Sequence, residues 1–226
     1  MKILRILICF YVFTSTEVYS QADSNNSVSL VDFVNPLVGS DSAFELSNGN
    51  TYPAIATPWG MNFWTPQTGE MGNGWGYTYD ANKIRGFKQT HQPSPWINDY
   101  AAFSLFPETG KLEINEDKRA SWFSHKAEIS KPHYYKVYLA DYDVTTEIVP
   151  TERGAQFQFT FPKTDNAHVL VDGFFKGSMV KVFPEERKIV GYCRNNSACS
   201  KLIKEDATFA VIFSLFNVLK VNTAPA

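Results

Sequence analysis

The sequence predicts an all-β protein, an antiparallel β-sandwich, and three observations support this prediction. Short runs rich in Val, Ile, Tyr and Phe recur along the second half of the chain, and Gly, Pro, Asn and Asp separate them. No segment shows a sustained helical period of apolar residues. The chain has 226 residues, which is enough for one domain with a sizeable core.

The first half of the chain predicts few regular elements. Residues 21–28 are polar and read as a flexible lead. The stretch Val31–Gly39 predicts a short strand that ends in a turn. Residues 40–60 are rich in Ser, Asn, Gly and Pro and predict a loop.

The second half predicts a succession of strands. Residues 156–161 are the clearest case, because Phe157, Phe159 and Phe161 alternate with polar side chains and Pro162 follows. The short link 151–154 favours a hairpin with the preceding run, and 184–187 predicts a tight turn. The first predicted strand ends at Pro107. The full set of predicted strands is 101–106, 111–115, 133–140, 142–149, 156–161, 169–171, 178–183, 188–192 and 208–216.

The first 20 residues are typical of a secretory signal peptide. Lys2 and Arg5 precede a short apolar stretch, and Ser20 offers a small residue at the expected cleavage point. This stretch is shorter than the roughly 20 residues that a membrane span needs. A retained anchor is the alternative. We therefore expect a secreted or periplasmic protein with no membrane span and a single domain over residues 21–226.

Charge and cysteine content exclude several classes of partner. The net charge is −2, and loss of residues 1–20 makes it only slightly more negative. There is no basic surplus of the kind that nucleic acid attracts, so a neutral partner is favoured. Cys193 and Cys199 allow a disulfide in an exported protein, and two free thiols fit equally well. Two Cys without a nearby His do not make a zinc site, so no metal is expected.

The most informative segment is the aromatic run from Trp59 to Trp96. It contains four of the five Trp, interleaved with Gly, Pro, Asn and Gln. Flat apolar rings beside amide and imidazole groups suit a sugar ring, whose C–H faces stack and whose hydroxyls need donors and acceptors. The alternative is that these rings fill space under long loops, because Trp is highly buried on average.

Catalytic groups are sparse in this segment. A glycosidase needs two carboxyl groups about 5 Å apart for retention or about 6.5–9.5 Å apart for inversion. Asp99 is the one carboxylate set among aromatic and amide residues, and it can equally cap a turn. His91 could bond a sugar hydroxyl or a loop carbonyl. We therefore expect no catalytic residues in this chain, and we expect His125, His133 and His168 to be structural.

Five blocks occur in a fixed order along the chain. In chain order, the blocks are Phe33-Val34-Asn35-Pro36-Leu37-Val38-Gly39, Gly49-Asn50-Thr51-Tyr52-Pro53-Ala54, Pro58-Trp59-Gly60-Met61, Gly76-Tyr77-x-Tyr79 and Ile84-x-Gly86-Phe87-x-x-Thr90-His91. Together they resemble the N-terminal domain of glycoside hydrolase family 92, the exo-acting α-mannosidases. The resemblance runs from about residue 31 to about residue 216, and Gly-Tyr-x-Tyr followed by Gly-Phe-x-x-Thr-His is its most specific part.

The resemblance implies a supersandwich-like β-sandwich and a role in binding terminal α-linked mannose of glycans. That family is calcium-dependent and inverts configuration. A C-terminal helical domain supplies its general acid, its general base and most calcium ligands, so no calcium is expected in this chain. Carried over by motif position, the expected substrate-binding residues are Trp75, His91, Trp96 and Trp64.

The sequence departs from the family pattern in two places. Nothing in it corresponds to the helical domain, and Ala198-Cys199-Ser200-Lys201 stands where a glycine-rich continuation is expected. The first hypothesis is therefore the N-terminal piece of an α-mannosidase, inactive as an isolated fragment. The alternatives are a stand-alone carbohydrate-binding module without catalysis and a non-functional remnant of a truncated reading frame.

Overall fold

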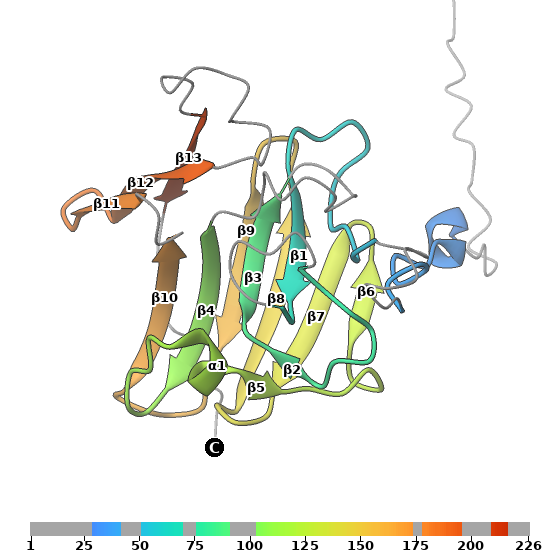
Figure 1. The fold of residues 1–226 in the computed structure, drawn as a ribbon, viewed down its shortest axis with the longest axis horizontal. Helices are drawn as coiled ribbons and strands as arrows, with labels where there is room; N and C mark the ends of the chain where they lie inside the picture. Colours follow the sequence, from blue (N-terminus) through green and yellow to red (C-terminus); the bar gives the residue numbers. More distant parts are fainter. Residues whose placement is uncertain are drawn as a thin grey trace, which may run out of the picture.

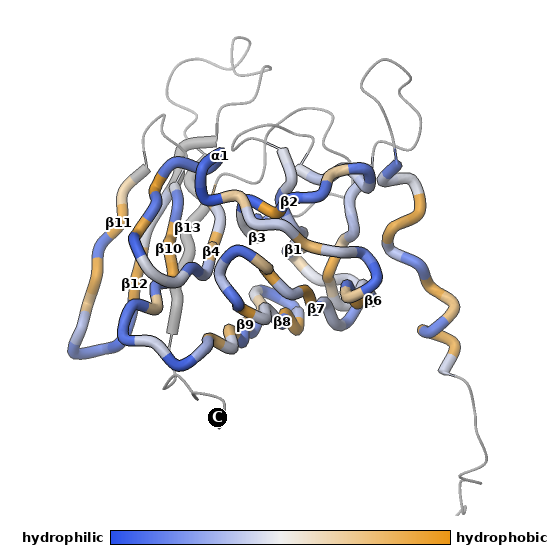
Figure 2. The backbone as a smooth tube through the Cα atoms, turned by 90° about the horizontal axis from the view of Figure 1, so that it is seen from below, coloured by the Kyte–Doolittle hydropathy of each residue, from blue (hydrophilic) through white to orange (hydrophobic). Residues whose placement is uncertain are grey.

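Two four-stranded antiparallel sheets stack to form the body of the protein. The computed structural model describes residues 29–41, 51–69, 76–90, 103–173, 178–195 and 209–216. Figure 1 shows one sheet in front of the other, and Figure 2 shows them from below as two layers. We call them the front sheet and the back sheet. The front sheet has the order β1 (Phe63–Gln67), β3 (Gly86–Thr90), β4 (Phe103–Thr109) and β10 (Ala167–Gly173), and the back sheet has the order β6 (Ile129–Lys131), β7 (Tyr134–Leu139), β8 (Val144–Pro150) and β9 (Ala155–Thr160).

Smaller elements surround the two sheets. A three-stranded sheet lies beyond the upper end of β10 in Figure 1. A two-stranded ribbon and one short helix lie along the lower edge, and a 3₁₀ helix lies near the N-terminus. These elements are β11 (Ser178–Phe183), β12 (Lys188–Asn195) and β13 (Phe209–Phe216), then β2 (Lys83–Ile84) and β5 (Ser121–Trp122), then α1 (Glu116–Arg119) and η1 (Leu30–Phe33).

The hydrophobic core fills the space between the front and back sheets. The Trp64 ring packs edge-on against Phe103 at 5.8 Å and against Phe157 at 4.7 Å between centroids. Phe87 packs edge-on against Tyr135 and Phe157. Because successive strand residues point to opposite faces, this burial takes mostly every second residue of a strand. In β4, the adjacent residues Leu105 and Phe106 are both buried. The buried core cluster is Ile55, Trp64, Ile84, Phe87, Phe103, Leu105, Phe106, Phe123, Tyr135, Val137, Leu139 and Ile148.

The other set of alternate residues gives the front sheet a polar outer face. One cross-strand row runs through all four strands, since Thr65 pairs with Lys88, Lys88 with Ser104, and Ser104 with Asp172. We call the set on this side the polar face. It consists of Thr65, Gln67, Lys88, Thr90, Ser104 and Asp172.

The all-β prediction is confirmed, and most predicted strands match observed ones. The 151–154 hairpin is present, with the Thr151 N–H donating to Gly154 O at 2.8 Å. The 184–187 turn is also present, with the Arg187 N–H donating to Pro184 O at 3.0 Å. Pro107 does not end its strand. β3 pairs with β4 only opposite Leu105 and Ser104, so the missing N–H of Pro107 removes no bond to β3.

Two strand predictions in other places are wrong. Residues 31–39 form η1 and a turn, because the Asn35 side chain accepts the Leu37 N–H and competes with extended backbone. Residues 111–115 form a loop instead of a strand. There the Asn115 side chain accepts the N–H groups of Asp117 and Lys118 and starts α1.

The aromatic run contains three strands that the sequence did not predict, namely β1, β2 and β3. β1 and β3 pair over their whole length, from Phe63 with Thr90 to Gln67 with Gly86. The Gly, Pro and Asn residues between the rings disguised them, because these residues are typical of turns. In the part of the chain that the structure describes, no helix is long and apolar enough to cross a bilayer.

Candidate functional site

Four residues were predicted to contact substrate, and the structure describes one of them. Trp75, His91 and Trp96 lie outside the described residues. Trp64 lies in β1 with 4% of its surface exposed. Its ring is a central part of the core, so its described role is packing, and its contact with sugar stays a prediction.

Trp64 also carries a polar atom that the core does not satisfy. Its Nε1 is buried and has no hydrogen-bond partner among the described residues. Gln89, its cross-strand neighbour on the same face, has a buried Oε1 in the same condition. A buried polar atom without a partner costs free energy, so this donor and this acceptor mark the Thr90 end of β3 as a polar spot within the core.

The polar face is buried although its side chains are hydrophilic. Lys88 and Ser104 are fully buried, and Thr65 is almost so. Burial lowers the pKa of the Lys88 ammonium to about 7, while the nearby carboxylates of Glu116 and Asp172 oppose that shift. The outer face of the front sheet therefore holds a basic group that can release its proton near neutral pH.

The polar face also lies beside the segments that carry two predicted sugar contacts. Thr90 immediately precedes His91 and ends β3 on this face, where its hydroxyl bonds the Tyr52 hydroxyl at 3.2 Å. Gly76 immediately follows Trp75 and lies over the same face. A Cβ added at Gly76 would lie 3.8 Å from Thr65 Cγ2 and 3.9 Å from Lys88 Cδ. The neighbours of Trp75 and His91 therefore flank the Thr65–Lys88 pair.

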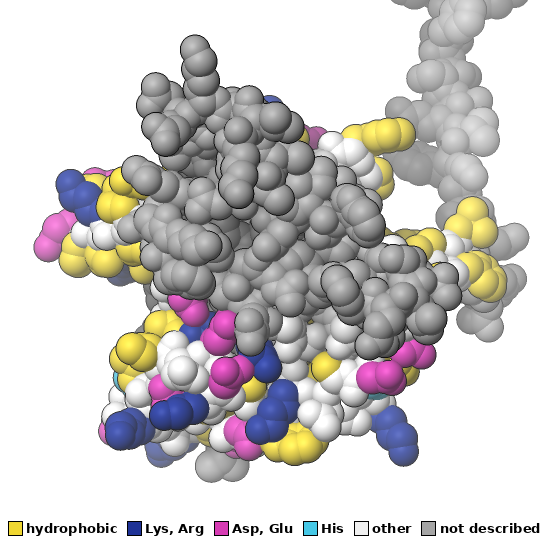
Figure 3. All heavy atoms as spheres, in the orientation of Figure 1, with side chains coloured by type: hydrophobic (Ala, Val, Ile, Leu, Met, Phe, Trp, Pro, Cys, Tyr) yellow, Lys and Arg dark blue, Asp and Glu magenta, His cyan; other side chains and the backbone are white. Residues whose placement is uncertain are grey.

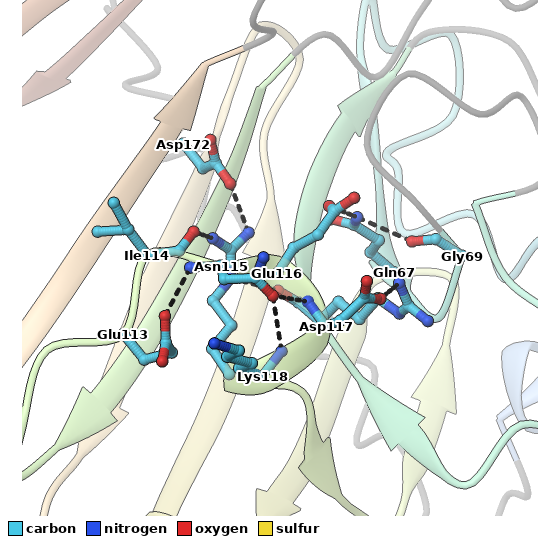
Figure 4. A network of polar contacts seen from close by, with 11 residues as sticks. Gln67, Gly69, Glu113, Ile114, Asn115, Glu116, Asp117, Lys118 and Asp172 are labelled. Carbon is cyan, nitrogen blue, oxygen red and sulfur yellow. Dashed lines mark hydrogen bonds and ion pairs between the residues drawn. The ribbon is translucent and has the colours of Figure 1, made fainter.

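Arg119 organises the part of the polar face around Asp172, which Figure 4 labels. Its side chain is fully buried and donates to Asp172 Oδ2 at 2.6 Å. It also donates to the carbonyl oxygens of Arg85 at 3.1 Å and Ile114 at 3.0 Å. A single guanidinium thus joins β10, the end of β2 and the loop before α1, and it neutralises the carboxylate at the end of the polar row.

Gln67 and Thr68 fix the base of the segment that carries Trp75. Gln67 Nε2 donates to Gly69 O at 2.9 Å and to Glu116 Oε2 at 3.2 Å (Figure 4). The Thr68 N–H donates to Gly76 O at 2.7 Å, and Thr68 Oγ1 accepts the Thr78 N–H at 2.9 Å. Both ends of the 70–75 segment are therefore held together next to the polar face.

A buried carboxylate holds the residues that follow this segment. Glu128 accepts the Tyr135 hydroxyl at 2.6 Å and the Tyr77 hydroxyl at 3.5 Å, and it bonds His125 Nδ1 at 2.6 Å. Burial and the Glu128 charge raise the pKa of Tyr77, so this phenol stays protonated as a donor. His125 also stacks on Tyr79 at 4.0 Å. The Gly-Tyr-x-Tyr block is thus a structural clamp in the described residues.

Sequence reasoning missed Lys88, Arg119, Asp172 and Glu128. For Lys88 the sequence offered only the neighbouring Phe87 as a signal, because Lys88, Gln89 and Thr90 are three polar residues in a row and show no alternation. Arg119 and Glu128 gave no such signal, since their partners lie far away in the sequence or on another strand. Within the described residues, no three His, Cys, Asp or Glu side chains gather as a metal site.

Comparison with known proteins gives consistent matches. The sequence model of the Glycosyl hydrolase family 92 N-terminal domain matches residues 33–224. The structure is similar to the family GH92 inverting mannosidase BT2199 from Bacteroides thetaiotaomicron VPI-5482, with 45% identity and a TM-score of 0.75. It is also similar to the family GH92 α-mannosidase BT3965 from Bacteroides thetaiotaomicron, with 30% identity and a TM-score of 0.64. No curated sequence relative reaches significance.

The extent of these matches is uneven between the partners. The BT2199 match covers 84% of this chain and 25% of that chain, and the BT3965 match covers 74% and 23%. This chain therefore spans about a quarter of the length of the solved relatives. The gh92 family glycosyl hydrolase ccman5 shares 21% identity with a TM-score of 0.60, which supports the fold alone.

Proposed function

The chain belongs to glycosyl hydrolase family 92, whose N-terminal domain it matches, and from this premise we propose that it is the sugar-holding domain of an α-mannosidase. In this role it contacts a terminal α-linked mannose of a glycan. The remainder of the enzyme hydrolyses the bond. We further propose that residues 1–20 direct the protein to a secreted or periplasmic location.

The observation that carries this proposal is the position of Gly76 and Thr90 over one face of the front sheet. Gly76 follows Trp75, and Thr90 precedes His91. Both neighbours flank the Thr65–Lys88 pair on the polar face. Anchor points this close favour a shared site in which an indole stacks on the C–H face of a sugar and an imidazole bonds a hydroxyl.

The polar face supports such a site without performing chemistry itself. Arg119 bonds Asp172, so the carboxylate at the end of the row is already engaged. Lys88 is buried, and its pKa is lowered to about 7. Near neutral pH its side chain can lose its proton, which avoids the free-energy cost of burying a charged ammonium. These groups stiffen the polar face next to Gly76. An acid and a base for inverting hydrolysis must come from elsewhere in the enzyme.

We assign the calcium-binding site to the remainder of the enzyme, because the described residues lack a suitable set of ligands. Calcium takes six to eight oxygen ligands, commonly from several carboxylates. The described residues contain no cluster of three such side chains, so they do not fit a calcium cage. We expect chelation by EDTA to leave the thermal midpoint of the 226-residue chain unchanged in a calorimetric scan. A clear drop in the midpoint would show a metal site within this chain.

Calorimetric titration with mannose and mannobiose tests the sugar-holding role. We expect weak heat of binding that Trp75→Ala and His91→Ala each abolish. Trp122→Ala is the matched control, because Trp122 lies on β5 and is 48% exposed. Equal binding by Trp75→Ala and the unmodified chain would contradict the proposal. Strong binding of larger mannans by the isolated chain would favour the stand-alone carbohydrate-binding module.

Hydrolysis of an aryl α-mannoside separates the binding role from catalysis. We expect no release of the aryl group by the isolated chain above the rate in buffer, because both proton-transfer groups are assigned to the remainder of the enzyme. Activity that disappears in Trp75→Ala would show a catalytic pair within these 226 residues. It would overturn the division of labour proposed here.

A further inference from the structure

The N-terminal arm, residues 30–38, exposes apolar side chains that a folded chain normally covers. Leu30 is 83% exposed, Phe33 75% and Val38 71%. Figure 1 shows this blue segment to the right of β6, and Figure 2 shows its hydrophobic stretches apart from the two sheets. The arm therefore buries little of its apolar surface in this chain.

A second exposed apolar feature is the turn at Trp59. The indole is 100% exposed, and its backbone has a φ of 61°, in the left-handed region that bulky residues avoid. The Gly60 N–H donates to Thr57 O at 3.0 Å, and a Cβ at Gly60 would meet Thr57 Oγ1 at 2.8 Å. The turn is thus held in a strained shape that presents a ring to solvent.

The arm and the turn meet the body of the protein at consecutive residues. Lys131 Nζ pairs with Asp32 Oδ1 of the arm at 2.9 Å. Pro132 O accepts the Ala56 N–H, just before the turn, at 2.9 Å. Figure 3 shows hydrophobic side chains gathered on this right-hand side, where the arm lies. We call this surface the apolar edge, and it consists of Leu30, Phe33, Val38, Trp59, Met61 and Ile129.

Polar atoms lie buried beneath the turn. Both side-chain polar atoms of Asn62 are buried without a hydrogen-bond partner among the described residues, and the Asn62 residue is 4% exposed. Thr57 Oγ1 is in the same condition. These atoms present no polar group at the surface of the turn, and the exposed side chains of Trp59 and Met61 beside them are apolar.

We propose that the apolar edge is the docking surface for the remainder of a family 92 mannosidase. The proposal rests on the assignment of this chain as the N-terminal domain in the proposed function. The matched part is 25% of the BT2199 chain, so three quarters of that relative lie outside the match and are available as a partner for this surface. Exposed Trp and Phe side chains are the usual anchors of such interfaces.

Charge and hydrogen bonding favour a protein surface over a sugar at this edge. The apolar edge offers rings and aliphatic groups, while the polar atoms of Thr57 and Asn62 beneath it are out of reach of solvent. Exposed Glu152 and Arg153 lie next to it, since the Met61 N–H donates to Glu152 O at 2.7 Å. An apolar centre with a charged rim is the usual anatomy of a protein interface.

A chimera tests the proposal. In it, this chain replaces the corresponding N-terminal quarter of the BT2199 mannosidase, and unfolding is followed by calorimetry. We expect one cooperative transition. Trp59→Ala should lower its midpoint by several degrees or split it in two, whereas the same substitution in the isolated chain should leave the midpoint unchanged, because the free ring touches nothing.

One control variant and one second test variant keep the outcome specific. Trp122→Ala removes an exposed Trp from β5, away from the apolar edge, and should change the chimera and the isolated chain equally. Phe33→Ala tests the arm and should act like Trp59→Ala, in the chimera only. Hydrolysis of an aryl α-mannoside by the chimera is measured in parallel. A folded chimera that has lost activity would contradict the sugar-holding role while leaving the docking surface intact.

Three results would overturn the docking proposal. The first is a chimera in which Trp59→Ala and Trp122→Ala have the same effect. The second is a chimera that stays unfolded with Trp59 present, because the apolar edge would then not fit the body of a 45%-identical relative. The third is concentration-dependent dimerisation of the isolated chain that Trp59→Ala abolishes, which would assign the apolar edge to a second copy.

Discussion

The two faces of the front sheet are built from the same four strands and are buried for different reasons. On the inner face, Phe87 and Leu105 pack against the back sheet and gain free energy from leaving water. On the polar face, Lys88 and Ser104 are buried just as completely. Burial of these groups costs free energy unless hydrogen bonds and ion pairs compensate.

This difference separates what determines the fold from what prepares a site. The inner face needs apolar side chains of suitable volume at alternate positions, which many sequences could provide. The polar face needs particular partners, such as Arg119 for Asp172 and Glu116 for Gln67. A protein without a use for this face could replace these groups by apolar residues at little cost in stability. The proposed sugar-holding role supplies such a use for the polar face.

Substitution on the inner face should have the largest effect on stability. Phe87 is fully buried, so Phe87→Ala should lower the free energy of unfolding by about 3–5 kcal/mol, because it leaves a cavity beside Tyr135 and Phe157. Urea denaturation followed by fluorescence measures this. Val149→Ala on β8 is the control, since Val149 is 43% exposed and should change stability little. A small effect of Phe87→Ala would mean that the inner face does not hold the two sheets together.

On the polar face, loss of Arg119 should cost nearly as much. Arg119→Met leaves the Asp172 carboxylate without its cation, and breaking a pair of this kind costs about 3 kcal/mol. Asp172 is 27% exposed, which places the value at the lower end of the usual range. Lys118→Met, on the same helix but exposed, is the control in the same denaturation experiment. Equal stability of Arg119→Met and the unmodified chain would show that the Arg119–Asp172 ion pair does not stabilise the fold.

The sequence predicted β7, β8 and β9 of the back sheet, but it did not predict β1, β3 or the side-chain pairs of the polar face, and the reasons are physical. Strands with alternating apolar residues, such as 156–161, follow from a period of two. β1 and β3 escaped prediction because turn-forming residues surround them, so their pairing depends on tertiary contacts. The Arg119–Asp172 pair spans 53 positions, and a single sequence carries no signal for a contact of that separation.

The candidate site shows the same division. Family motifs predict sugar contacts at Trp75, next to Gly-Tyr-x-Tyr, and at His91, the last residue of Gly-Phe-x-x-Thr-His; both residues lie outside the described part of the chain, so these contacts stay predictions. Trp64 was expected to contact sugar and is buried in the core, which its motif position did not reveal. Burial depends on Phe103 and Phe157, which come from other strands. Local composition therefore did not reveal the burial of the Trp64 ring.

The pH dependence of stability should come next in size and should distinguish the two faces. Burial lowers the pKa of Lys88 to about 7, below its value in the unfolded chain, so the unfolded state binds more protons between these two values. Stability should therefore rise with pH above about 7, by up to about 1.4 kcal/mol per pH unit. Lys88→Met should flatten this rise, because it removes the titrating group.

The measurement is urea denaturation at several values between about pH 7.5 and pH 9.5. This window avoids the tyrosines, because the raised pKa of Tyr77 and Tyr135 makes stability fall only above about pH 10. Other groups that titrate in this range contribute equally to both proteins. The same slope for Lys88→Met and the unmodified chain would mean that the Lys88 ammonium keeps its ordinary affinity for protons despite its burial.

The smallest effect should come from the cap of α1, which ties the polar face to the rest of the fold. Asn115 Oδ1 accepts the N–H groups of Asp117 and Lys118, so Asn115→Ala should cost about 1 kcal/mol. Asn115→Asp keeps the acceptor and adds a favourable charge at the helix start, so it should cost less. Because Arg119 ends α1, loss of the cap should speed hydrogen exchange at the Arg119 amide and leave the Phe87 amide slow. Faster exchange at both amides would show that the two faces open together, and the separation drawn between them would then fail.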